Sequence, residues 1–458
     1  MANQVLTPRL AQRILNAAGL DFHVLLTLVF RGWGILAGAI TMVLLPMWLS
    51  PSQQGYYYTF ASLLALQIFF ELGLNQVIVQ LVSHEAAHLS FNKDGIVHGD
   101  AERQARLGGI VALIRRWYTI AALLFAVLTS GAGWFFFGRY EGEALPVNAW
   151  APAWGIVVVF SAINLFLSPW LAFIEGTGQV GQVARLRLIQ SVAGYSMLWI
   201  LLLLGANLWI SAAIPIASVV STLLWLRSRS SWFKHMSSEK TTISWRHDIF
   251  PLQWRIAVSW ASGYFIFNLF TPVVFSSHGA KEAGRLGMAM SVFNAASTLG
   301  LSWINAKAPT FTMYISRGES AALNRLFKAV SLRSTAVTAV LGFTVVAVVA
   351  IANHQGITAI HRIASPDTLF WIACASVANT AVYSAATYMR AHREEPMLPV
   401  SVVIALLTII AVVLMRDDVI RMMMVYAAIC TCISLPWTAL LLKRYRARHI
   451  APQSIDPV

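Results

Sequence analysis

The stretch that decides the fold is Ser334–Ala352, which reads STAVTAVLGFTVVAVVAIA and holds 19 residues without a charge. At about 1.5 Å of rise per residue, a helix of that length nearly crosses the roughly 30 Å hydrocarbon core of a bilayer. Leu198–Leu204 is a second continuous apolar run. Strands of membrane barrels are short and alternate in hydrophobicity, and lipid requires backbone groups to be bonded within each segment. Both runs therefore predict membrane-spanning helices.

The composition of the whole chain agrees with a lipid environment. Of its 458 residues, 58% are hydrophobic and 11% are charged, whereas soluble domains carry about 25% charged residues. This composition excludes a soluble enzyme, a disordered chain and a disulfide scaffold. The three cysteines fall in apolar stretches, and we interpret each as a small buried hydrophobic residue.

Twelve stretches of the chain are long and apolar enough to be spans, which predicts an all-α polytopic membrane protein. The predicted spans are 24–49, 56–82, 117–138, 152–174, 188–206, 209–226, 256–276, 286–315, 334–352, 368–389, 397–415 and 422–442.

A long polar stretch near the middle of the chain separates six spans from six. Pro46 and Gly55 near the start of the first half are echoed by Pro272, Gly284 and Gly287 in the second. We therefore expect two six-helix lobes related as a repeat, a plan that puts the substrate site between them. The expected divisions are a cytoplasmic N-terminal segment 1–23, an N-lobe 24–227, a cytoplasmic linker 228–255, a C-lobe 256–442 and a cytoplasmic tail 443–458.

The basic residues set the expected orientation. With the N-terminus in the cytoplasm, 25 of the 33 Lys and Arg residues fall on the inner face and six on the outer face. This positive-inside bias predicts that both termini are cytoplasmic. It also accounts for the net charge of +14 without a nucleic-acid partner; membrane lipid headgroups are the expected anions. The six outer cations are Arg139, Lys281, Arg285, Arg362, Arg416 and Arg421.

Two charges lie well inside the first two predicted spans. Arg31 and Glu71 fall at similar depths on neighbouring antiparallel helices, roughly 27 and 24 Å from their outer ends at 1.5 Å per residue. Charges at such depth are costly and usually face protein or water. One interpretation is a structural Arg31–Glu71 ion pair. The other is that Arg31 faces a cleft and binds an anionic group, with Glu71 tuning it or carrying a proton.

Further polar residues extend the candidate substrate site. Gln67, Glu71 and Asn75 are spaced as one polar stripe on the predicted helix 56–82. Lys307 either snorkels to the inner interface or faces the cleft opposite Arg31. A looser polar set on the same predicted span as Lys307 comprises Asn294, Ser297 and Asn305, and the basic residue near the first span of the second half is Arg255.

One motif suggests an enzyme. The sequence His84-Glu-Ala-Ala-His88 matches H-E-x-x-H, in which two histidines hold zinc and the glutamate is a general base. A membrane metalloprotease is therefore an alternative, but no third ligand is evident and the motif falls at the cytoplasmic end of a span. The chain also has no G-x-x-x-x-G-K-[ST] loop and no G-x-S-x-G elbow. We expect a protein that is not an enzyme, with no metal and no cofactor.

Several segments resemble a known superfamily, and they are Gln54–Ser62, Glu71–Leu74, Glu175–Gln179, Pro251–Ala257 and Trp303–Pro309. The chain resembles the polysaccharide flippases of the multidrug/oligosaccharidyl-lipid/polysaccharide exporter superfamily. The resemblance implies a bacterial inner-membrane protein that turns undecaprenyl-pyrophosphate-linked oligosaccharide to the outer leaflet for cell-surface polysaccharide synthesis. Relatives of the lipid II flippase type carry cleft arginines, one of them on the first helix, and Arg31 holds a comparable position.

The resemblance implies alternating access, in which the pyrophosphate pairs with Arg31, Lys307 and Arg255 while the prenyl tail stays in lipid. A polysaccharide polymerase is an expected partner. A cation-coupled multidrug extruder of the same superfamily remains an alternative, and it predicts an acidic rather than a basic cleft.

Overall fold

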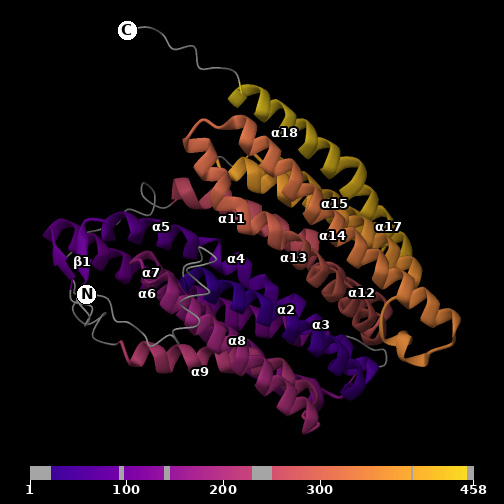
Figure 1. The fold of residues 1–458 in the computed structure, drawn as a ribbon. Helices are drawn as coiled ribbons and strands as arrows, with labels where there is room; N and C mark the ends of the chain where they lie inside the picture. The colour runs from indigo at the N-terminus through magenta and orange to yellow at the C-terminus, as the bar shows by residue number, and fades with distance from the viewer. Residues whose placement is uncertain (1–21, 92–96, 139–144, 230–249, 393–395, 451–458) are drawn as a thin grey trace, which may run out of the picture. The chain divides into compact units, whose positions relative to one another are not determined.

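The computed structural model describes residues 22–91, 97–138, 145–229, 250–392 and 396–450. Within these ranges all twelve predicted spans are helical, so the prediction of an all-α polytopic protein is confirmed. One short antiparallel sheet was not predicted. It pairs β1 (Leu89–Phe91) with β2 (Val97–Gly99), and Figure 1 shows it at the end of α5.

The helices are long and apolar enough for a multi-pass membrane protein. In the described part of the chain, eight helices meet the length and apolarity of a membrane span, and a ninth does so if one bent pair is a single span. Two shorter apolar helices are Gly32–Trp48 and Leu398–Leu414. The remaining predicted span is α13 (Ala280–Ser316), which is long but less apolar because several polar residues interrupt it.

The chain divides into two compact units. The first comprises residues 1–44, 73–131 and 152–252, and the second comprises 45–72, 132–151 and 253–458. The elements that contribute to the first unit are α2 (Phe22–Trp48), α5 (Leu74–Ala86), the sheet, α6 (Ala101–Gly138), α7 (Val147–Gly176), α8 (Val180–Leu203), η2 (Asn207–Ala212) and α9 (Ala213–Arg227).

The second unit contains the remaining helices and the ends of α2, α6 and α7. Its own elements are α3 (Pro51–Leu64), η1 (Ala65–Gln67), α4 (Ile68–Glu71), α11 (Phe250–Phe267), α12 (Phe270–His278), α13, α14 (Ser320–His354), η4 (Thr358–Arg362), α15 (Pro366–Arg390), α16 (Leu398–Leu414), α17 (Val419–Ala428), the π-helical segment η5 (Ile429–Ser434) and α18 (Leu435–Ile450).

Polar side chains and a glycine join helices inside the first unit. Gln190 on α8 donates to the Thr222 hydroxyl of α9 at 2.6 Å. A Cβ on Gly194 would lie 3.2 Å from the Cα of Ile214, so α8 and α9 are in close contact at this point. Close approach through small residues is a common way for helices to associate in a membrane.

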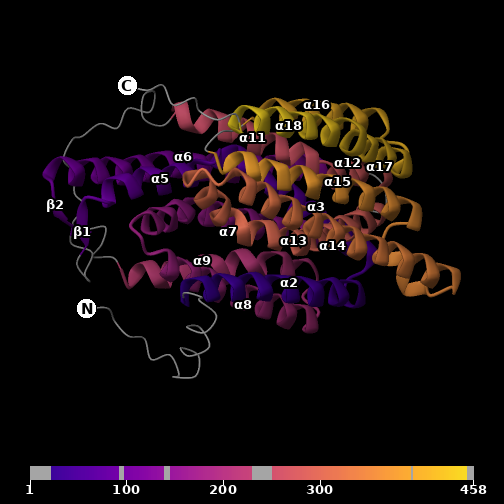
Figure 2. The same ribbon diagram turned by 45° about the horizontal axis from the view of Figure 1, so that its top comes forward.

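In the second unit α13 is the central helix, with α3, α14 and α15 packed along it (Figure 2). Glycines permit two of these contacts. A Cβ on Gly55 of α3 would lie 2.5 Å from the carbonyl carbon of Ala280, and one on Gly287 would lie 2.7 Å from Cγ of Tyr58. A Cβ on Gly300 would lie 2.7 Å from the carbonyl oxygen of Ser334 on α14. These positions exclude side chains, which explains why glycines recur where the helices meet.

The predicted helix 56–82 differs from the structure at both ends and in the middle. It begins earlier, at Pro51, because Ser50 and Gln53 form a reciprocal capping box. It then breaks at Leu72 and Gly73, which have left-handed φ values of 48° and 68°. Glycine adopts this conformation readily, but leucine does not, so nothing in the local sequence indicates that the break includes Leu72.

Candidate functional site

The second unit contains a partly open cavity of about 430 Å³, which is the candidate functional site. We call it the C-unit cavity. Side chains of α3, the α11–α12 region, α13, α15 and α17 line it. A volume of this size can hold a small organic group such as a sugar. Its polar lining residues are Tyr58, Ser62, Asn268, Thr271, Ser291, Asn294, Ser297, Ser376, Asn379, Thr380, Tyr383 and Tyr426.

Local packing positions α3 and α13 on the cavity. The absence of a side chain at Gly287 leaves space for the ring of Tyr58, which is 7% exposed. On α13, Gly287, Asn294 and Leu301 are separated by seven residues each, which is close to two helical turns and keeps them on one face. This face of α13 therefore lines the cavity and presents Asn294 to it.

Hydrogen bonds hold the α15 side of the cavity. Asn379 Nδ2 donates to the Tyr426 hydroxyl at 3.0 Å, which ties α15 to α17. The Thr380 hydroxyl donates to the carbonyl of Ser376 at 2.9 Å. Tyr426 is 2% exposed and Thr380 is 1% exposed. Fixed amides and hydroxyls of this kind can donate to and accept from a ligand's hydroxyl groups.

Among the described residues, the lining of this cavity carries no formal charge. All nineteen of its residues are apolar, hydroxyl, amide, thioether or aromatic. An ionised ligand group deep in this space would therefore have no opposite charge beside it, whereas neutral hydrogen-bonding groups would be well matched. Of the six residues predicted from the sequence, the five whose side chains the structure describes (Gln67, Glu71, Asn75, Arg255 and Lys307) do not line the cavity, although two members of the looser α13 set, Asn294 and Ser297, do.

The two predicted cations of the second unit lie elsewhere on their helices. Lys307 is an exposed residue of α13, six positions beyond the cavity residue Leu301. Pro309, two residues further on, stays within the continuous helix. Arg255 is an exposed residue of α11 whose guanidinium lies 5.4 Å from the ring centroid of Trp254.

The predicted Gln67–Glu71–Asn75 stripe is interrupted. Gln67 lies in η1 and Glu71 in α4, and both are half-buried. Asn75 lies in α5, beyond the left-handed break, so the prediction of one continuous helical stripe is wrong. Asn75 instead joins helices of the first unit.

The contacts of Asn75 show what that residue does. Its Nδ2 donates to the Ser168 hydroxyl of α7 at 3.0 Å, and its Oδ1 accepts from the Tyr118 hydroxyl of α6 at 2.8 Å. Arg31 belongs to α2, but its side chain lies outside the described residues. The predicted contact between Arg31 and Glu71 therefore stays a prediction.

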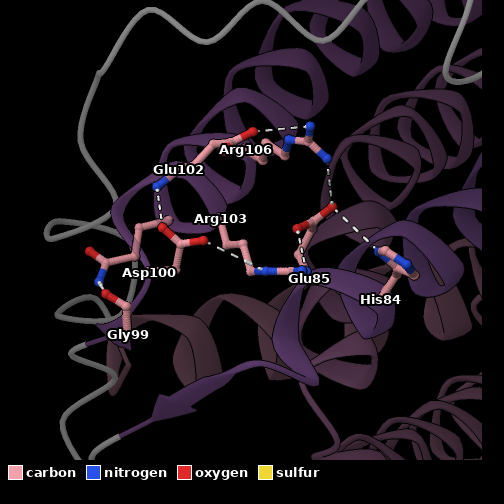
Figure 3. Close-up of polar contacts among 8 residues, drawn as sticks. His84, Glu85, Gly99, Asp100, Glu102, Arg103 and Arg106 are labelled. Carbon is pink, nitrogen blue, oxygen red and sulfur yellow. Dashed lines mark hydrogen bonds and ion pairs between the residues drawn. The ribbon is translucent and has the colours of Figure 1, made fainter.

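The H-E-x-x-H motif lies at the end of α5, where Glu85 is part of an ion-pair cluster (Figure 3). Its carboxylate is 10% exposed and lies 3.4 Å from Arg103 Nη1 and 3.5 Å from Arg106 Nη1, both on α6. His84 Nδ1 is 3.5 Å away, while its side chain is 74% exposed. Two guanidinium groups thus occupy the oxygens that a general base would need.

Metal ligation finds no further support among the residues that the structure describes. No group of three or more His, Cys, Asp or Glu side chains in these ranges could hold a metal ion. The buried glutamate of the motif is accounted for by its ion pairs, which join the end of α5 to the start of α6.

Sequence reasoning missed the α15 residues of the cavity. Asn379 and Tyr383 lie in a predicted span whose apolar residues mask them, and neither carries a charge that would stand out. The sequence feature that could have indicated these residues is an amide in the middle of a predicted span, since an amide in lipid needs a hydrogen-bond partner. On 368–389 that signal singles out Asn379.

Comparison with known proteins gives a likeness in structure only. No family model matches the chain, and no curated protein matches it in sequence. The MATE multidrug transporter DinF-BH aligns with 93% of this chain and 96% of its own, with a TM-score of 0.59 at 12% identity.

Two other solved structures align over a similar extent. The lipid II flippase MurJ in an inward closed conformation aligns with 93% of this chain and 89% of its own, with a TM-score of 0.56 at 12% identity. A multidrug resistance MATE family transporter of the MOP superfamily, in an inward-facing conformation, aligns with 89% of this chain and 99% of its own, with a TM-score of 0.53 at 12% identity. The chain therefore has the polytopic helical fold that the MATE and MurJ transporters of the MOP superfamily share.

Proposed function

We propose that the protein is a flippase that moves undecaprenyl-pyrophosphate-linked oligosaccharide across the bacterial inner membrane by alternating access, for cell-surface polysaccharide synthesis. The shared fold supports transport, because the matching structures are those of transporters and a flippase. The two proposed lobes, 24–227 and 256–442, open a site alternately to each face, with both termini in the cytoplasm.

The observation that carries this proposal is the uncharged, hydrogen-bonding lining of the C-unit cavity. Asn268, Asn294 and Asn379 supply amides, and serine, threonine and tyrosine hydroxyls surround them. Sugar units present many hydroxyl groups and often no charge, so each can pair with an amide or hydroxyl without leaving an ion desolvated. The aromatic rings of Tyr58 and Tyr383 add apolar surface for the faces of a sugar ring.

The pyrophosphate is assigned to the cations rather than to this cavity. Lys307 lies six residues beyond Leu301, which corresponds to about 9 Å along an α-helix. A diphosphate bound near Lys307 is thus within reach of a sugar in the cavity. Charge-assisted bonds from lysine and arginine to phosphate are the strongest of the polar contacts available. Arg31 and Arg255 are proposed to share this role, with Glu71 tuning Arg31.

A multidrug extruder is the second candidate, because two of the structures above are of multidrug transporters. A cationic drug calls for a carboxylate at its site. The described lining of the C-unit cavity has no carboxylate, and Glu71 is the acid within the predicted spans that could pair with such a drug. The glycan proposal fits the cavity better, and one experiment separates the two.

Cells that lack this protein are the decisive test. We expect them to accumulate a sugar-loaded polyprenyl diphosphate on the inner leaflet and to lose a surface polysaccharide, both restored by the wild-type gene. Susceptibility to cationic dyes and drugs is measured in the same strains. Unchanged lipid-linked sugar together with increased drug susceptibility would refute the flippase and support the extruder.

A further inference from the structure

We propose that the second unit holds a separate binding site for a phosphate or diphosphate group, at the end of the unit that is predicted to face outward. The site is a pocket of about 280 Å³, which we call the basic pocket. It is lined by Pro51, Gln54, Lys281, Arg285, His361 and Arg362, all of which belong to the second unit. None of them lines the C-unit cavity.

The gathering of cations is the first argument. Only six Lys or Arg residues are predicted on the outer face, where the positive-inside rule makes them scarce. Three of the six, Lys281, Arg285 and Arg362, line this one pocket although they come from two elements far apart in the sequence, α13 and η4. In the part of the chain that the structure describes, no acidic residue lines this pocket.

An unpaired guanidinium nitrogen is the second argument. Nη1 of Arg362 is buried and has no hydrogen-bond partner. A buried charged donor without a partner is unfavourable, and a phosphate oxygen in the pocket would satisfy it. Arg285 is more fully engaged, since its Nε donates to the His361 carbonyl at 2.7 Å and it pairs with Glu282 beside the pocket. Arg362 is therefore the residue assigned to contact the ligand, and Lys281 adds positive charge to the pocket lining.

The backbone around the pocket is fixed and adds favourable dipoles. Gln54 is 1% exposed, and its Nε2 donates to the carbonyls of Gly284 and Arg362, each at 3.0 Å. These bonds tie α3, α13 and η4 together. Pro51 and Gln54 belong to the first turn of α3, and Lys281 to the first turn of α13. Two helix N-termini thus meet at the pocket, and both favour an anion.

The remaining acceptor refines the ligand chemistry. Oε1 of Gln54 is buried and unpaired in the same pocket. It can accept from the O–H of a protonated phosphate or from a hydroxyl group next to it, whereas a fully ionised sulfate offers no such donor. The ligand is a phosphate-type group, either the headgroup of an outer-leaflet lipid or a free phosphate or pyrophosphate. The proposal of this anion site does not depend on whether the transported substrate is a glycan or a drug.

The test measures anion binding to the purified full-length protein. Inorganic pyrophosphate is titrated into wild type and into the Lys281→Gln/Arg362→Gln double variant, with binding followed by calorimetry. Arg416→Gln/Arg421→Gln is the matched control, because it removes the same charge from the same predicted face but lies outside the pocket. We expect saturable binding that weakens at least about tenfold in the pocket variant and stays within about twofold in the control.

A second probe identifies the source of the ligand. Farnesyl diphosphate is presented in phosphatidylcholine nanodiscs that contain the protein, and binding tighter than that of pyrophosphate indicates a lipid headgroup. Equal affinity indicates a free anion. If the double variant does not fold, Lys281→Gln alone replaces it, since that side chain is exposed; its expected loss is at least about threefold. Absence of saturable binding to wild type, or an equal loss in pocket variant and control, overturns the proposal.

Discussion

Replacing Gly55 with alanine tests how closely α3 and α13 pack. The new Cβ would lie 2.5 Å from the carbonyl carbon of Ala280 and 2.9 Å from its Cα. Carbon atoms in contact prefer about 3.5–4.0 Å, and the carbonyl oxygen of Ala280 lies even closer to the new Cβ. The two helices must therefore separate locally by more than about 1 Å. Overpacking of this kind costs about 1–3 kcal/mol. Because the obstacle is backbone, a change of side-chain rotamer cannot relieve it.

The separation should also disturb the C-unit cavity, because Tyr58 and Ser62 lie on the same helix as Gly55. We expect Gly55→Ala to lower the melting temperature of the purified protein and to reduce export in cells lacking the wild-type gene. Gly263→Ala on α11 is the control, since a Cβ there meets nothing within 4 Å. Alanine in a helix interior is favoured over glycine by about 0.5–1 kcal/mol. A Gly55→Ala protein that melts as high as the Gly263→Ala protein would refute the close backbone contact.

Three further substitutions test other contacts. Asn75→Leu removes the amide that bonds the Ser168 hydroxyl and the buried Tyr118 hydroxyl, so the free energy of unfolding should fall by about 1–3 kcal/mol. A melting temperature equal to that of wild type would argue against the network. Glu85→Gln removes the carboxylate that two arginines share and should lower the free energy of unfolding by about 1–2 kcal/mol. Metal analysis should find no stoichiometric zinc in wild type or in the variant. One zinc per wild-type chain, together with loss of activity in Glu85→Gln, would favour the protease instead. Asn379→Ala should reduce export at least about fivefold while the protein still inserts into the membrane. The control is Asn324→Ala, which also loses a tyrosine hydroxyl partner but lies outside the cavity, and it should leave export near normal. Equal losses of export in the two variants would indicate general destabilisation.

The helices were predictable because lipid imposes a simple rule on the sequence. An uncharged apolar stretch of sufficient length has few alternatives to a spanning helix, and Ser334–Ala352 lies entirely within α14. The break between α4 and α5 was not predictable to the same degree. Gly73 permits it, but Leu72 in a left-handed conformation depends on tertiary contacts that local preference cannot reveal.

The candidate site was harder to predict because its chemistry is neutral. A charge within a span is conspicuous, so Arg31, Glu71 and Lys307 drew attention, and their roles stay predictions. Residues such as Asn379 and Tyr383 do not stand out, since tyrosines also anchor helices at the membrane interface. Only the packing of α13 against α3 and α15 shows which neutral side chains share a cavity.

The glycines near the start of each half of the chain allow two interpretations, an internal repeat or a close contact between helices. Gly55, Gly284 and Gly287 entered the prediction as marks of a duplicated chain. In the structure they lie on a single contact, where a Cβ on Gly284 would come within 2.8 Å of the Gly55 nitrogen. Their spacing is therefore explained by the fit between two helices of the second unit, and it no longer supports a repeat by itself.

The π-helical segment η5 has a consequence for how this protein tolerates change in length. Ile429–Ser434 accommodates more residues per turn than the α-helical segments on either side. Tyr426 before it reaches the C-unit cavity, while Arg446 after it lies 4.9 Å from the Phe327 ring. Deleting one residue from the wide turn would rotate α18 by about 100° relative to α17. The wide turn thus fixes which side of α18 faces the same way as the cavity-lining side of α17. A change in its length would alter that relation even if both helices kept their own sequences.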